Sequence, residues 1–314
     1  MKKIIAGLLL AAYIGGLQPA KAQVKDNLKG DISLSGAFAL YPMVVKWAEE
    51  FKKIHPNVRI DISGGGAGKG MTDALAKVVD LGMVSREVYD VEVKKGAVAF
   101  AVVKDAVVPT VNASNPVLAD IKAKGLKRSA ALNLWSGKCK TWGDVLGTNS
   151  KVPVHVYTRS DACGAAETWA AWFGKRQEDL DGTAVFGDPG VASAVQKDKI
   201  GIGFNNIAYA YDQKTRRPYA GLTIIPLDVN GNGKIDPEEN FYDNSLSLIK
   251  AIVSGKYPSP PARNLFLVSN GIPKKPVVVE FIKYILTEGQ KYANATGYIG
   301  LSKTTINQEL AKLK

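Results

Sequence analysis

Short apolar segments of this chain end repeatedly in a run of small residues that leads into a helix. Three such turns are Ser35–Phe38, Gly64–Gly70 and Arg159–Ala165. Strands that alternate with helices in this way indicate a sheet with mostly parallel strands. In such open α/β sheets, ligands bind outside the carboxyl ends of the strands. The sequence therefore predicts an α/β protein with a binding site at these turns.

The positions of the helices and strands follow from hydrophobic periodicity. Residues 97–111 look like a pair of apolar strands broken at Lys104 and Asp105, a stretch that could carry the chain between domains. The length of 314 residues is enough for about two domains. Helices are expected over residues 42–54, 71–78, 191–196 and 276–286, and strands over residues 31–34, 58–62, 81–86, 152–157, 200–204 and 265–268.

The third turn carries the clearest functional signal. Arg159 follows an apolar strand, and small residues separate it from the next helix. The N–H groups at a helix N-terminus are free to bind an anion, and small side chains let the anion approach them. An arginine adds a planar fork of donors that is always charged. This turn predicts a site for a small oxyanion, with Arg159 as the principal charge contact and Asp161 near enough to orient it.

The glycine-rich turn at residues 64–70 does not match a nucleotide-binding loop. Ser63 stands at the first glycine position of that pattern, and Gly70 replaces the required serine or threonine after Lys69. Two interpretations remain: a strand-to-helix turn whose backbone N–H groups face an anion, and a plain tight turn.

The N-terminus has the pattern of a secretory signal peptide. Lys2 and Lys3 precede an apolar run over residues 4–17, and residues 20–22 fit the cleavage rule. We expect removal of residues 1–22 and export to a bacterial periplasm. The formal net charge of +12 favours the capture of anions. Because the lysines are scattered, without an arginine–aromatic block, nucleic acid is not an expected partner.

The order of these motifs resembles that of the periplasmic phosphate-binding proteins that serve ABC transporters. Residues 36–42 are similar to the family's first ligand loop, and residues 66–71 with 80–86 to its second loop and third strand. Residues 159–164 resemble its Arg-x-Asp-Gly-Ser-Gly-Thr turn, and residues 265–301 also match. The resemblance implies a two-lobed, type II-like fold. Each lobe has a parallel-rich sheet flanked by helices, and the ligand lies in the cleft between the lobes.

The resemblance also implies a domain organisation and partners. Residues 23–107 and 263–314 are expected to form lobe 1, and residues 108–262 lobe 2, with a hinge that closes on the ligand. The expected ligand is phosphate or a related small oxyanion, and the expected partner is an ABC permease. A monomer that performs no chemistry on its ligand is the expected form.

The family's ligand positions are only partly kept in this chain. The family binds phosphate through several side-chain hydroxyls, and most of the matching positions here lack one. Ser85 falls where some members place an aspartate that accepts the phosphate proton. Arg159 and Asp161 are retained, and backbone N–H groups could replace some of the hydroxyl donors. The implied ligand-binding residues are Ala37, Phe38, Ala39, Ala67, Gly68, Ser85, Arg159, Asp161, Cys163, Gly164 and Ala165.

Residues 228–239 match the pattern of a twelve-residue calcium loop. Oxygen-bearing side chains stand at positions 1, 3, 5, 9 and 12, and Gly233 stands at position 6. The strand-like residues 222–226 before the loop are unlike the entering helix of an EF-hand, and an Asn-Gly turn without metal is the alternative. The expected ligands are Asp228, Asn230, Asn232, the Lys234 carbonyl, Asp236 and Glu239.

The two cysteines, Cys139 and Cys163, allow two interpretations: a pair of buried thiols, or one disulfide in an oxidising compartment. We predict the disulfide. A thiol at a helix N-terminus near Arg159 would have a lowered pKa. A second class of function is therefore an exported hydrolase or phosphatase with Cys163 as its nucleophile. A third is a calcium-stabilised binding module without anion affinity.

Overall fold

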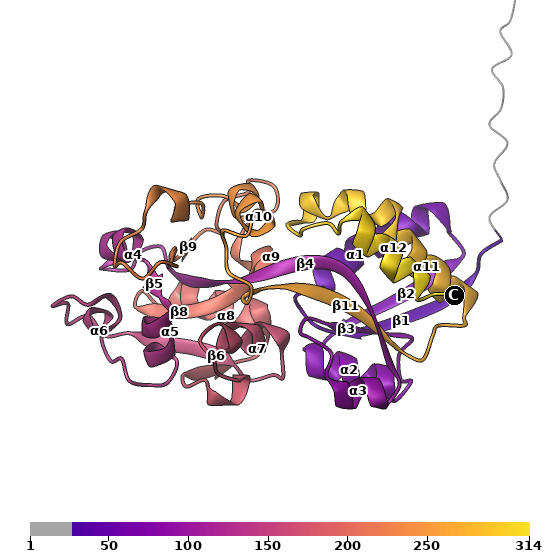
Figure 1. Ribbon diagram of the computed structural model, residues 1–314, viewed down its shortest axis with the longest axis horizontal. Helices are drawn as coiled ribbons and strands as arrows, with labels where there is room; N and C mark the ends of the chain where they lie inside the picture. Colours follow the sequence, from indigo (N-terminus) through magenta and orange to yellow (C-terminus); the bar gives the residue numbers. More distant parts are fainter. Residues whose placement is uncertain (1–26) are drawn as a thin grey trace, which may run out of the picture.

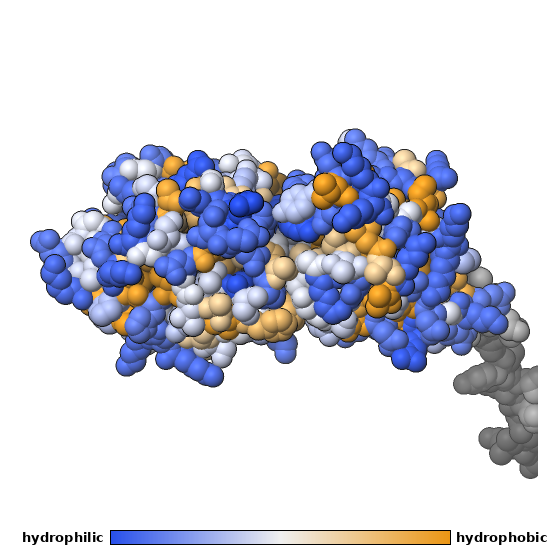
Figure 2. All heavy atoms as spheres, turned by 90° about the horizontal axis from the view of Figure 1, so that it is seen from below, coloured by the Kyte–Doolittle hydropathy of each residue, from blue (hydrophilic) through white to orange (hydrophobic). Residues whose placement is uncertain are grey.

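A computed structural model describes residues 27–314, which form an elongated molecule of two lobes joined by two long strands (Figure 1). The predicted signal peptide lies outside the described residues. On the face seen in Figure 2, hydrophilic side chains predominate and hydrophobic ones gather in small separate groups. Within residues 27–314, no helix is both long and apolar enough to cross a membrane.

The first lobe is built from both ends of the described chain. Its three parallel strands place their carboxyl ends toward the second lobe, and β1 lies between β2 and β3. The elements of this lobe are β1 (Gly30–Gly36), α1 (Tyr41–Ile54), β2 (Val58–Gly64), α2 (Ala67–Leu75), β3 (Leu81–Val84), α3 (Asp90–Lys94), α11 (Pro276–Leu286), η3 (Glu288–Tyr292), η4 (Asn294–Thr296) and α12 (Lys303–Ala311).

The second lobe is built from one continuous stretch of chain. Its three strands β8, β6 and β7 run parallel to one another. Its elements are α4 (Leu118–Lys124), β5 (Leu126–Lys127), α5 (Arg128–Leu134), α6 (Trp142–Leu146), β6 (His155–Arg159), α7 (Gly164–Trp172), η1 (Gln177–Asp179), β7 (Thr183–Val185), α8 (Gly187–Lys197), β8 (Gly201–Asn206), α9 (Ile207–Ala210), β9 (Leu222–Ile224), β10 (Leu227–Asp228), η2 (Pro237–Glu239) and α10 (Ser245–Val253).

Two antiparallel strands, β4 (Ala97–Asn112) and β11 (Ala262–Asn270), pass through both lobes and join their sheets. The resulting strand order is β2-β1-β3-β11-β4-β8-β6-β7, with β9 also paired to β4. The mixed α/β architecture with flanking helices confirms the predicted fold class. The predicted break at Lys104 and Asp105 is wrong, because both residues keep their places in the ladder opposite Asn264 and Arg263.

The hydrophobic residues form two main clusters, one in each lobe. On β4 the first cluster ends at Val103 and the second begins at Ala106. On β11 the second cluster ends at Ala262 and the first begins at Leu265. The residues between the clusters are therefore cross-strand neighbours, and a register shift follows at Leu265/Phe266. Strands β4 and β11 therefore pass from one hydrophobic cluster to the other at paired positions in the sheet.

Candidate anion site between the lobes

The three small-residue turns of the sequence come together where the lobes meet. Gly68 at the start of α2 donates its N–H to the carbonyl oxygen of Ala162 at 3.1 Å. Gly164, the first residue of α7, lies so close to Ser85 that a Cβ there would overlap it. Glycine is needed at this point because the backbones of the two lobes touch.

The aromatic ring of Phe38 closes one side of this contact region. Its centroid lies 6.0 Å from the guanidinium carbon of Arg159 and 5.6 Å from the ring of Phe186, which it meets edge-on. Tyr209 donates its hydroxyl to the carbonyl oxygen of Phe38 at 3.1 Å. The first turn therefore contacts both the arginine turn and α9 of the second lobe.

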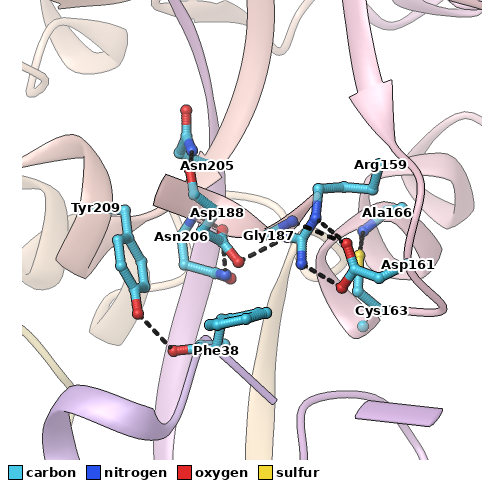
Figure 3. A network of polar contacts seen from close by, with 12 residues as sticks. Phe38, Arg159, Asp161, Cys163, Ala166, Gly187, Asp188, Asn205, Asn206 and Tyr209 are labelled. Atoms are coloured by element: carbon cyan, nitrogen blue, oxygen red, sulfur yellow. Dashed lines mark hydrogen bonds and ion pairs between the residues drawn. The ribbon is translucent and has the colours of Figure 1, made fainter. Parts of the chain in front are cut away.

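Arg159 lies at the end of β6 and is held by two aspartates (Figure 3). Its Nε and Nη2 donate to the Asp161 carboxylate at 2.8 and 2.6 Å, and its Nη1 donates to Oδ2 of Asp188 at 2.6 Å. Only 1% of the Arg159 side chain is exposed. Burial alone would lower the pKa of Arg159, but the neighbouring carboxylates, Asp188 foremost, raise it overall. The guanidinium is thus a fixed positive charge.

Asp188 is itself fixed by the last two residues of β8. Its Oδ1 accepts hydrogen bonds from the side-chain amide of Asn206 at 2.6 Å and from the Asn206 N–H at 3.1 Å. Its carbonyl oxygen accepts one from the amide of Asn205 at 2.9 Å. These contacts, drawn in Figure 3, hold the carboxylate beside Arg159.

The sequence did not predict Asp188, Asn205 or Asn206 as site residues. A signal was present, since Gly187-Asp188-Pro189-Gly190 stands directly before the predicted helix at 191–196. In the structure α8 begins at Gly187, so this segment is a fourth small-residue turn. The two asparagines end a glycine-rich strand whose carboxyl end faces the same region.

The charges at the site have a direct consequence for ligand binding. One guanidinium faces two carboxylates, Asp161 and Asp188. Of the five N–H donors of an arginine, three are directed at these aspartates, and two remain. An anion that binds Arg159 must use the remaining donors or displace one of the two aspartates.

The two cysteines are free thiols, so the predicted disulfide is wrong. The Cys163 sulfur caps α7 and accepts a hydrogen bond from the Ala166 N–H at 3.4 Å. Cys139 lies after α5 at a separate cavity lined also by His155 and Asp181. The two side chains therefore serve different parts of the lobe.

The predicted lowering of the Cys163 pKa is also wrong. Burial raises the pKa of this thiol to about 12, although Arg159 opposes the shift. The thiolate is the nucleophilic form of cysteine, so Cys163 is a poor nucleophile at neutral pH. This result argues against the hydrolase alternative.

The alanines of the predicted site turn their methyl groups into the two cores. Ala37, Ala39 and Ala67 belong to the first hydrophobic cluster, and Ala165 belongs to the second. They can offer a ligand only backbone groups, and Ala37 already donates its N–H to the carbonyl oxygen of Met83 at 2.8 Å. Contact between these residues and a ligand stays a prediction.

The calcium-like loop is closed by its own carboxylates. Glu239 accepts the N–H groups of Val229 and Asn230 at 2.9 and 3.2 Å, which brings the end of the loop beside its start. Asp228 accepts those of Gly231 and Gly233, each at 2.7 Å. Among residues 27–314, no group of three or more histidine, cysteine or acidic side chains is arranged to hold a metal. Calcium binding therefore stays a prediction.

Fold and site together define a two-lobed α/β binding protein with an arginine fixed at the contact between its lobes. The chain belongs to the PBP superfamily, whose domain model matches residues 19–288. This membership agrees with the resemblance read from the sequence motifs.

Comparison with known proteins gives relatives of one kind. The chain is 26% identical to the phosphate-binding protein PstS of Staphylococcus aureus strain USA300, over 98% of this chain and 89% of that protein. It is similar in structure to a phosphate ABC transporter substrate-binding protein from Clostridium perfringens, solved with bound phosphate. That match has a TM-score of 0.71 and 22% identity, and covers 87% of this chain and all of the other.

A second solved structure, an ABC-type phosphate transport receptor from Vibrio cholerae, matches with a TM-score of 0.63 and 19% identity. It covers 86% of this chain and 100% of that chain. These relatives are binding proteins of transport systems, not enzymes.

Proposed function

We propose that this protein is an exported solute-binding protein that captures phosphate, or a closely related oxyanion, between its lobes. It then delivers the anion to an ABC permease and acts as a periplasmic monomer. Support comes from the relatives described above and from the predicted signal peptide. Phosphate is the leading ligand because the relatives are named for it.

One observation carries this proposal. The fixed guanidinium of Arg159 lies where the N-terminal ends of α2 and α7 meet, at the contact between the lobes. Helix N-termini present N–H donors and a partial positive charge, and in a buried place both act strongly on an anion. Backbone donors from two lobes can therefore take the place of the missing hydroxyl side chains.

The ligand enters this site when the lobes separate. Arg159, Asp161, Ser85 and Ala67 are all buried in the present arrangement. We propose that residues 23–107 with 263–314, and residues 108–262, move as two bodies about β4 and β11. Opening would break interlobe contacts near the site, among them the Gly68–Ala162 and Tyr209–Phe38 hydrogen bonds.

The test is calorimetric titration of the purified mature protein with phosphate and, separately, with sulfate. We expect phosphate to bind. Arg159→Lys keeps the charge but loses the planar fork, and should weaken phosphate binding by about 1.5–3 kcal/mol. Arg59→Lys is the matched control, because Arg59 is exposed and, among residues 27–314, forms its ion pair with Asp61. A stably folded protein without affinity for either anion would contradict the proposal and favour a binding module of another kind.

We also propose that residues 228–239 bind calcium as a structural ion. The supporting observations are the spacing of oxygen-bearing side chains and the burial of Asp228 and Glu239 at the two ends of the loop. Asn230, Asn232, Asp236 and the Lys234 carbonyl would supply further oxygens, of the kind that a hard cation prefers. The loop begins in β10, which pairs with β5 in the second lobe.

A further inference from the structure

Arg263 is a buried arginine on β11 that none of the ligand motifs includes. Its side chain is 5% exposed. Nη1 donates to the carbonyl oxygen of Gly164 and, at 2.9 Å, to the hydroxyl of Thr168, so it holds the first turns of α7. Nη2 donates to the side-chain oxygen of Asn206. One guanidinium thus joins α7, which begins at the anion turn, to the end of β8.

The contact with Asn206 continues to the ligand arginine. The Asn206 amide nitrogen donates to Asp188 at 2.6 Å, and Asp188 accepts from Arg159 at 2.6 Å. An arginine can only donate hydrogen bonds, and a carboxylate can only accept them. The amide between them therefore has one satisfactory orientation, with its oxygen on Arg263 and its nitrogen on Asp188. Asp188 and Arg263 thus both favour this orientation, and Arg263 holds the oxygen end of the amide in place.

The place of Arg263 in the fold adds a mechanical argument. It lies opposite Asp105 in the strand ladder, with its Nη2 3.8 Å from that carboxylate, at the step where β4 and β11 change from one core to the other. A rotation of one lobe against the other must deform the sheet near this step. Such a deformation displaces Arg263 relative to Asn206 and α7.

We propose that Arg263 is a positioning residue of the anion site. Through Asn206 it holds Asp188 in the orientation that leaves part of Arg159 available, and its place on β11 links this orientation to the arrangement of the lobes. This inference rests on the proposed function, which it deepens. If Arg263 is replaced, the Asn206 amide is less firmly held, and its hydrogen bond to Asp188 weakens. The Asp188 carboxylate is then free to form a second hydrogen bond with Arg159, so anion affinity falls.

The test is a double-mutant cycle on the mature protein, with phosphate affinity and melting temperature measured together. Arg263→Lys keeps the charge but cannot reproduce the forked contacts. We expect it to weaken phosphate binding about tenfold, within the range of couplings seen in shared hydrogen-bond networks. In the Asp188→Asn background, the same change should weaken binding less than about twofold, because the competing carboxylate is gone.

Two further variants separate positioning from stability. Asn206→Ala removes the intermediate amide. It should weaken phosphate binding in the wild-type background and have little effect in the Asp188→Asn background, which keeps the test valid if Arg263→Lys folds poorly. Tyr211→Phe removes a buried hydrogen bond to Tyr242 within the same lobe, and should lower the melting temperature without changing phosphate affinity.

Three outcomes would overturn the proposal. Equal weakening by Arg263→Lys in both backgrounds, with the wild-type protein binding phosphate, would show that Arg263 does not act through Asp188. Wild-type affinity in the single Arg263→Lys variant would show that charge alone suffices. Absence of phosphate binding by the wild-type protein would overturn the proposed function and this inference together.

Discussion

Oδ2 of Asp188 lies 2.6 Å from Nη1 of Arg159, and each of the two side chains is 1% exposed. The residues are 29 positions apart in the chain and come from different strand-to-helix turns. The carboxylate occupies a donor of the group that we propose for anion binding. If Arg159 binds the anion as proposed, the carboxylate of Asp188 competes with the ligand for this guanidinium.

The first prediction follows from this competition. Asp188→Asn removes the negative charge but keeps the size of the side chain, so phosphate should bind about tenfold more tightly, or about 1.4 kcal/mol. Calorimetry at about pH 8, where phosphate is a dianion, measures the change. Asp161 still pairs with Arg159 in this variant, and the protein should fold. Weaker binding would instead show that Asp188 accepts a hydrogen bond from the ligand.

A second prediction concerns the thiols. Protein purified without reductant and then denatured should contain two free thiols, as measured by reaction with a chromogenic disulfide reagent. In the native protein both should react slowly, because Cys139 and Cys163 are buried and burial raises the pKa of each. Single Cys→Ser variants assign the two signals. If no thiols were detected before reduction, the prediction of a Cys139–Cys163 disulfide would be correct after all.

The third prediction concerns the pH dependence of stability. Burial raises the pKa of Asp105 from about 3.8 to about 7, although Arg263 opposes the shift. The folded state holds this proton more tightly than the unfolded state. The contribution of Asp105 to the free energy of unfolding is therefore full below about pH 4, declines as the pH rises, and is lost above about pH 7.

Asp105→Asn mimics the protonated residue at every pH. The variant should match the wild-type protein at about pH 4 to within a small difference, and should be the more stable of the two at about pH 8. The slope removed is up to about 1.4 kcal/mol per pH unit between the two pKa values. Urea unfolding at both pH values measures the effect. Parallel pH profiles of the two proteins would mean that Asp105 is ionised throughout.

A fourth prediction tests the calcium loop. Saturating calcium should raise the melting temperature of metal-free protein, by an amount that corresponds to about 2.7 kcal/mol at a hundredfold excess over the dissociation constant. Glu239→Gln should abolish this shift and leave phosphate affinity unchanged. The glutamine oxygen can still accept the N–H groups of Val229 and Asn230, so the loop itself should close. Identical melting in calcium and in chelator would show that the loop holds no metal.

Local patterns were sufficient to predict several elements of the fold. The helix predicted over residues 276–286 has those bounds in the structure, because Pro276 starts it and the apolar periodicity continues to Leu286. The helix predicted from Met71 begins at Ala67 instead. Gly70 lies within this helix, where a Cβ would overlap the carbonyl oxygen of Met83. Sequence alone presents such a glycine as part of a loop, whereas the structure uses it for close packing.

The same limit applies to the site. The contact of Arg159 with Asp161 was predictable, because only one residue separates them in the sequence. Asp188 contacts Arg159, and Asn206 contacts Asp188, only because of the order of strands β8, β6 and β7 in the sheet. Whether an aspartate that follows the neighbouring strand faces an arginine or solvent depends on that order, which no local pattern specifies.

The position of β11 in the sheet has a consequence for how the chain folds during synthesis. β11 lies between β3 and β4, yet it begins at residue 262, after the whole second lobe (Figure 1). A chain that emerges N-terminus first can pair β4 with β8 before β11 exists, whereas the Leu81–Val84 edge of β3 must wait. All four residues of that edge are buried in the finished protein. An exposed apolar edge is a site of aggregation, so the nascent first lobe, rather than the second, is the part of this protein that most needs a chaperone.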